Sequence, residues 1–251
     1  MIREHLFHKR IATDPMFRWR GGEISRLEGL SDGVFALSLT LLVMSTEVPG
    51  TFYELWRAAV QLPIFVACFA MLMMAWRYHY LFFRRYGLED LPTTVLNAVY
   101  LFLLLFLAFP LKFLATFLFR VAAHEPVGAM FAVPPGVEFQ SDFAQRGTMM
   151  VFYGAAILGV FGTQALMLAW AWRRRHDLEL DRLERFLTRS SMLAHGITCA
   201  IATASIVVVV TLGNPGIAGV VYFAMPFAHG AHGWWSGRRA AALQQQLAAQ
   251  A

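Results

Sequence analysis

The sequence predicts an all-α integral membrane protein with six transmembrane helices. Of its 251 residues, 58% are hydrophobic and 15% are charged, whereas soluble domains carry about 25% charged residues. Uncharged runs cover residues 58–76, 91–111, 147–172 and 190–237, and each is long enough to cross a hydrocarbon core of about 30 Å. The basic residues gather between alternate pairs of these runs, which is typical of multi-pass proteins.

The first span is expected over residues 26–48. It opens with charged residues and then runs without charge from 33 to 46, so a helix over 25–48, roughly 36 Å long, crosses the bilayer. At 100° per residue Asp32 lies on one side with Phe35, while an apolar stripe lies on the other. A carboxylate at this depth is either solvated among headgroups or part of a functional site. The stripe consists of Arg26, Leu30, Gly33, Leu37, Leu41, Met44 and Val48, with Thr40 at its edge.

The second and third spans are expected over residues 54–83 and 91–119. The second holds Pro63 near one end and closes with Trp76 and His79 on one helical face. The third carries Asn97 near the same side of the membrane and Pro110 beyond its middle, where a proline should kink the helix. Both spans therefore bring polar residues to the same membrane side as Asp32.

The remaining spans follow from one glycine-rich run and one long apolar run. Residues 147–172 form the fourth span, with small residues that permit close helix contact. Residues 190–237 are about twice the length of one crossing, and the sequence Gly-Asn-Pro-Gly at 213–216 divides them into a fifth and a sixth span. The charged linker 173–189 is expected to be helical, because its acidic and basic residues recur at three- and four-residue spacings.

The distribution of basic residues predicts the topology. Only Arg57, Lys112, Arg120 and Arg146 of the 21 Lys and Arg residues fall on one side of the six expected spans. The other side is then cytoplasmic and holds both termini. The predicted organisation is a cytoplasmic arm (1–23), a six-helix transmembrane domain (24–237) and a cytoplasmic tail (238–251), in a multi-pass protein of the cell membrane.

Several functional classes lack their motifs. The sequence has no paired carboxylates within a span, no nucleophile motif and no phosphate-binding glycine loop, so an enzyme or ATPase is not expected. His79, His195, His229 and His232 lack the further ligands of a zinc site, and no metal or other cofactor is expected. The basic residues are divided by lipid-crossing segments, which argues against a nucleic-acid partner and suits an anionic bilayer surface.

A motif in the first span resembles one in the transmembrane protein 175 family of potassium channels. Arg26 is followed after three residues by Leu-Ser-Asp-Gly-Val-Phe-Ala at 30–36 and by Thr-Leu-Leu-Val at 40–43. The family carries Arg-x-x-x-Phe-Ser-Asp before an apolar helix that contains threonine. The resemblance covers about the first 110 residues and continues at Trp76, His79, Asn97 and the pair Phe109-Pro110. Leu30 replaces the motif phenylalanine, and Met44 replaces a branched aliphatic residue.

The resemblance implies a homotetrameric, potassium-selective channel in the lipid bilayer, with the first helix of each subunit lining a central pore. Leu37, Leu41 and Met44 would form successive constricting rings, and Thr40 would offer a hydroxyl beside them. The resemblance also implies a structural network of Arg26, Leu30, Ser31, Asp32, Trp76, His79 and Asn97.

Three alternatives to this interpretation stay open at the level of the sequence. The stripe of Leu37, Leu41 and Met44 can equally be a core or lipid-facing surface, as apolar stripes usually are. A secondary or proton-coupled transporter could use Asp32, His79 and Asn97 as a relay, although the halves of the chain show no inverted repeat. A membrane scaffold without transport activity is the third possibility.

Overall fold

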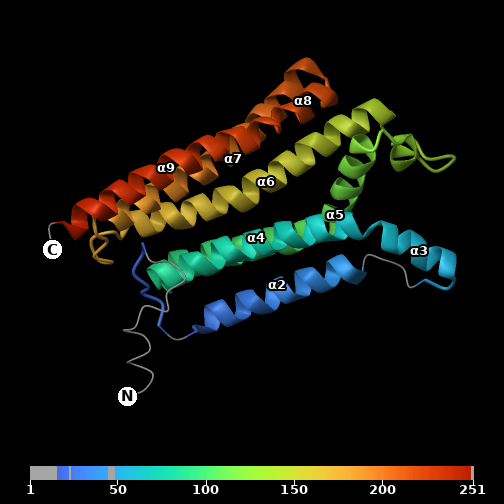
Figure 1. Ribbon diagram of the computed structural model, residues 1–251. Helices are drawn as coiled ribbons and strands as arrows, with labels where there is room; N and C mark the ends of the chain where they lie inside the picture. Colours follow the sequence, from blue (N-terminus) through green and yellow to red (C-terminus); the bar gives the residue numbers. More distant parts are fainter. Residues whose placement is uncertain (1–15, 23, 45–48, 250–251) are drawn as a thin grey trace.

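The computed structural model describes residues 16–22, 24–44 and 49–249, and within these ranges the chain is helical with no strand. The helices form an elongated bundle, with α2 on one side and α8 and α9 on the opposite side (Figure 1). The elements are α2 (Arg26–Met44), α3 (Phe52–Val60), α4 (Leu62–Tyr86), α5 (Leu91–Ala122), the 3-10 turn η1 (Gly128–Phe131), α6 (Asp142–Arg173), α7 (Arg182–Leu212), α8 (Pro215–Val221) and α9 (Ala224–Ala248).

Four segments within the described ranges are long and apolar enough to cross a membrane. They are α4, residues Leu91–Ala108 of α5, α6 and α7. The other two expected spans correspond to α2 and to α8 with α9. Both carry charged residues: α2 contains Arg26, Glu28 and Asp32, and α9 contains Arg238 and Arg239. The multi-pass, all-helical class is therefore supported, whereas the count of six spans and the cytoplasmic termini remain predictions.

The predicted single helix over residues 54–83 is wrong, because the chain forms α3 and α4 with a break at Gln61. Pro63 is the physical reason: it is the second residue of α4, and its ring excludes a helix that continues from the preceding turn. The start of α3 is fixed separately by a capping box, in which Thr51 and Glu54 satisfy each other's backbone N–H groups.

The predicted break at residues 213–216 is confirmed. Helix α7 ends at Leu212, and Gly213 follows with a φ of 63°, a left-handed conformation that glycine adopts without strain. The Asn214 side chain then accepts hydrogen bonds from the first N–H groups of α8. The charged linker is not one helix: Arg173 ends α6, residues 174–181 turn the chain, and α7 begins at Arg182.

The bundle consists of successive helix pairs. Helix α2 packs on α4 and α5, α5 packs on α6, α6 packs along α7, and α9 packs on α7. Pro110 lies inside α5, and α5 changes direction in Figure 1 as expected for an interior proline. The Pro110 carbonyl accepts a hydrogen bond of 2.6 Å from the Tyr153 hydroxyl, which joins α5 to α6 at this point.

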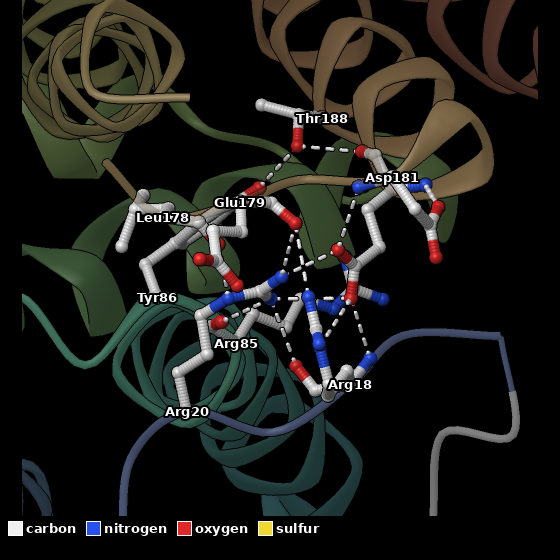
Figure 2. A network of polar contacts seen from close by, with 9 residues as sticks. Arg18, Arg20, Arg85, Tyr86, Leu178, Glu179, Asp181 and Thr188 are labelled. Carbon is white, nitrogen blue, oxygen red and sulfur yellow. Dashed lines mark hydrogen bonds and ion pairs between the residues drawn. The ribbon is translucent and has the colours of Figure 1, made fainter. Parts of the chain in front are cut away.

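The described part of the N-terminal arm is fastened to the α6–α7 linker by two arginines. The fully buried Glu184 carboxylate accepts hydrogen bonds from the Arg20 guanidinium and from the Arg18 backbone N–H. Figure 2 shows Arg18 and Arg20 reaching the linker, where they donate to the backbone carbonyls of Glu179 and Leu178 at 2.9 and 2.8 Å. The arm that leads into α2 is thus held by the start of α7.

Replacing the buried acid should destabilise this junction. We expect Glu184→Gln to lower the free energy of unfolding by about 3 kcal/mol, because the Arg20 guanidinium then lacks a buried counter-charge. Thermal unfolding of the detergent-solubilised protein measures the effect. Glu179→Gln is the matched control, since Glu179 is exposed and contributes only its backbone carbonyl. Equal unfolding temperatures for the two variants would contradict this role of Glu184.

A second carboxylate, Asp90, joins the α4–α5 turn to the end of α6. It caps α5 through the Thr93 N–H at 3.1 Å and accepts hydrogen bonds of 2.9 Å from Trp170 Nε1 and Arg174 Nη1. Burial alone would raise the pKa of Asp90, but the hydrogen bonds from Thr93 and Trp170 and the charge of Arg174 outweigh it. The pKa therefore lies below its ordinary value of 3.8.

This lowered pKa predicts an acid-sensitive contribution to stability. Above pH of about 4 the carboxylate is ionised in both states and its contribution is complete, and the contribution is lost as the pH falls through the lower folded-state pKa. Asp90→Asn should therefore unfold at a lower temperature than the unmodified protein at pH 7, with a difference that shrinks toward pH 3. Thermal unfolding across this range measures the difference, and a gap independent of pH would contradict the assignment.

Candidate functional site

One side of α2 is buried against α4 and α5. Phe35 and Leu42 are 4% and 1% exposed and belong to a core cluster with Leu72 and Tyr100. Ser38 is fully buried on this side, and its hydroxyl donates to the Val34 carbonyl at 2.9 Å. The inner side of α2 is therefore apolar, and the hydroxyl of Ser38 on it is bonded to a carbonyl of the same helix.

The opposite side of α2 is left uncovered by the chain itself. Leu37 is 48% exposed, Val43 is 54% exposed, and Leu41 is half-buried. The Thr40 hydroxyl donates to the Ala36 carbonyl at 2.9 Å, which leaves its oxygen lone pairs free to face outward. The side chain of Met44 lies outside the described residues. Leu37 and Thr40 thus share an outer surface that no other helix of the described chain covers.

A buried chain of hydrogen bonds connects α2, α4 and α5. The Asn97 amide nitrogen of α5 donates to the Ser31 hydroxyl at 3.1 Å, and Ser31 in turn donates to the Leu27 carbonyl at 2.7 Å. On its other side the Asn97 carbonyl oxygen lies 2.7 Å from His79 Nε2 of α4, so this nitrogen carries the donated proton. The His79 ring stacks on Tyr100 with centroids 5.6 Å apart.

Asp32 makes a separate contact with α4. Trp76 Nε1 donates to Asp32 Oδ1 at 2.9 Å, and the Trp76 ring stacks on Tyr80 with centroids 5.3 Å apart. Asp32 itself is exposed and borders an open cavity of 230 Å³ between α2 and α4, together with Ala36 and Met73. This carboxylate is therefore held by the indole at the edge of the α2–α4 interface.

The structure brings together five of the seven expected network residues, as two separate contacts. Ser31, His79 and Asn97 form one, and Asp32 and Trp76 form the other. Within the described ranges Arg26 and Leu30 are exposed and join neither contact. Within these ranges no hydrogen bond links Asp32 to His79, so a continuous proton relay through the two has no geometric support.

An ion pair that the sequence analysis did not identify lies beside these contacts. The buried Arg84 of α4 donates to both carboxylate oxygens of Glu28 at 2.7 and 2.8 Å. Glu28 also caps the start of α2 by accepting from the Ser25 N–H at 3.0 Å. The available signal was an acidic residue one turn before Asp32 in an otherwise apolar helix, but the sequence alone did not point to Arg84 as its partner.

His229 and His232 have ordinary hydrogen-bond partners. Nε2 of His229 lies 3.0 Å from the Thr198 hydroxyl, and Nε2 of His232 lies 3.2 Å from the Ser190 hydroxyl. Among the described residues no three side chains of His, Cys, Asp or Glu are close enough to hold a metal ion. These histidines connect α7 to α9.

Removing the bridging amide should loosen α2. Asn97→Leu has a similar volume but leaves the His79 Nε2–H without its acceptor, so we expect a loss of roughly 1–2 kcal/mol in the free energy of unfolding. Thermal unfolding in detergent measures this loss. Thr94→Val, which removes an exposed hydroxyl one turn earlier in α5, serves as the control and should unfold like the unmodified protein. An unchanged unfolding temperature for Asn97→Leu would show that the bridge is not stabilising.

Comparison with known proteins identifies the family. Residues 26–110 match the family described as endosomal/lysosomal potassium channel TMEM175. A potassium channel of Marivirga tractuosa is 35% identical over 218 residues, which cover 84% of this chain and 83% of that protein. A potassium channel of Chamaesiphon minutus is 31% identical over 126 residues, covering 44% of this chain and 61% of that protein.

A solved structure extends the similarity to the fold. The crystal structure of a variant of the potassium channel MtTMEM175, in complex with a nanobody–MBP fusion protein, superposes with a TM-score of 0.76 at 31% identity. The similarity covers 91% of this chain and all of the other. The chain belongs to the TMEM175 family, whose members are potassium channels and not enzymes.

Proposed function

We propose that this protein is a potassium-selective cation channel of the cell membrane, assembled as a homotetramer with α2 of each subunit lining a central pore. Family membership and the relatives named as potassium channels support the activity. The single observation that carries the pore assignment is the two-sided character of α2. One side is anchored to α4 and α5, while the side with the half-exposed Leu37 is covered by no helix of the described chain.

The proposed constriction consists of Leu37, Leu41 and Met44. Their spacing of four and three residues places successive rings about 6 and 4.5 Å apart along the helix. Leucine offers no ligand to replace water around an ion, so the barrier comes from constriction and dehydration. Potassium sheds its water more readily than sodium, and such a barrier therefore favours potassium. Thr40, at the edge of the same surface, adds an oxygen that can contact a passing ion.

The buried contacts of α2 support this mechanism by fixing its orientation. A rotation of α2 about its axis would separate Ser31 from Asn97 and Asp32 from Trp76. Asp32 is then an anchoring residue, and the proposed constriction itself is uncharged. The transporter alternative gains no support, because Asp32 and His79 take part in different contacts.

Changing Leu37 should change ion selectivity. We expect Leu37→Ala to widen the constriction and Leu37→Asn to hydrate it, so both should raise sodium permeability relative to potassium. A tenfold change in the ratio of sodium to potassium permeability corresponds to a change of about 1.4 kcal/mol in the difference between the two permeation barriers. Reversal potentials of purified protein in planar bilayers, measured under potassium and sodium gradients, give the ratio.

Leu193→Ala is the matched control, because Leu193 is 51% exposed, close to the 48% of Leu37, but belongs to α7, whereas α2 packs on α4 and α5. It should leave the reversal potential unchanged. The mass of the intact assembly in the same preparation gives the number of subunits. Reversal potentials unaffected by either substitution of Leu37 would remove this residue from the ion path.

A further inference from the structure

We propose that the ends of α6, α7 and α9 that meet at the α6–α7 linker form a binding site for the headgroup of an anionic phospholipid. An open cavity of 760 Å³ lies between these three ends. Five of the side chains that line it are arginines, namely Arg175, Arg182, Arg185, Arg189 and Arg239. They come from the linker, from two turns of α7 and from α9, so only the folded chain brings them together.

The cavity carries a large excess of positive charge. Asp181 is the one acidic residue among its lining, and its carboxylate is engaged as the cap of α7, where it accepts from the Glu184 N–H at 2.8 Å. Within the described part of the chain none of the five arginines forms an ion pair. Guanidinium groups bind phosphate oxygens in a bidentate manner, so the site suits a ligand with two or more negative charges.

Two of the arginines are positioned by an aromatic ring. The guanidinium carbons of Arg189 and Arg175 lie 4.3 and 5.1 Å from the centre of the Trp172 ring. Arg175 also donates to the Trp172 carbonyl at 3.1 Å. These cation–π contacts hold both guanidinium groups at the cavity without neutralising them, so less conformational freedom is lost when an anion binds.

The apolar lining favours a lipid over a free phosphate ion. Phe186 lies in the cavity wall beside Leu180 and Leu243, and its ring packs on Trp235 with centroids 5.8 Å apart. Beyond it, Leu193 lies two turns further along the same side of α7 and is half-exposed, as is Trp235. Tryptophans at the ends of apolar helices mark the depth of lipid headgroups. A headgroup in the cavity would therefore have its acyl chains beside exposed apolar side chains.

The site lies on helices other than α4 and α5, on which α2 packs. Helix α9 packs on α7, whereas α2 packs on α4 and α5 on the opposite side of the bundle (Figure 1). A bound lipid would therefore leave the proposed ion path open. Lipid binding can be tested without any measurement of ion flow, so its outcome is independent of the proposed channel activity.

Native mass spectrometry of the purified full-length protein tests the proposal with defined lipids. We expect cardiolipin, which carries two phosphates, to bind at least tenfold more tightly than phosphatidylcholine. The double variant Arg185→Gln/Arg189→Gln should lose roughly an order of magnitude or more in cardiolipin affinity, because each arginine near an anionic surface contributes about fivefold. Equal binding of cardiolipin and phosphatidylcholine would overturn the proposal.

Variants of two neighbouring arginines on α9 distinguish binding at a defined site from general attraction between opposite charges. Arg239 lines the cavity, whereas Arg238 lies over the Trp234 ring at 4.8 Å and does not line it. Arg239→Gln should lower cardiolipin affinity severalfold, and Arg238→Gln should leave it within about twofold. Equal losses in the two variants would show that no specific site exists. Inorganic phosphate should fail to displace cardiolipin at millimolar concentration, and displacement would show that the site binds free phosphate instead.

Discussion

The hydrogen bonds of the Asn97 amide are the constraint on which the arrangement of α2 depends. In the membrane interior no water replaces a missing partner, so buried polar groups must bond to protein. Asn97 uses its nitrogen for Ser31 and its oxygen for His79, and thereby ties α5 to α2 and to α4. A rotation of α2 by one residue, about 100°, would break the bond to Ser31. The side of α2 that carries Leu37 faces outward because the other side is held in this way.

Two ion pairs fix the same end of the bundle. Arg84 and Glu28 join α4 to the start of α2, and Arg20 and Glu184 join the arm before α2 to the start of α7. Arg84 also donates to the Gly22 carbonyl at 3.3 Å, which links the two pairs through the backbone of the arm. The helix proposed to line the pore is thus connected at its first turn to both halves of the bundle.

Much of the helical layout could be predicted because it depends on local signals. Uncharged runs located the long helices, and the Gly-Asn-Pro-Gly sequence located the end of α7. Pro63 was recognised but its effect was underestimated, so α3 and α4 were merged. The contacts of Asn97, His79 and Trp76 were expected from the family resemblance, since periodicity alone places polar residues on faces but does not pair them. The bond between Glu28 and Arg84 was not anticipated, because 56 residues separate the two.

The outer surface of α2 has a consequence for how the protein is made. Between residues 36 and 43 its side chains are alanine, leucine and valine, and the one hydroxyl at Thr40 is already bonded to its own backbone. Acyl chains therefore solvate this surface without leaving a polar group unsatisfied. For the proposed homotetramer, this means that a newly inserted subunit can finish folding alone in the bilayer and meet its copies later by lateral diffusion. Formation of the proposed tetramer would then depend on the concentration of subunits in the membrane and not on the biosynthesis of each one.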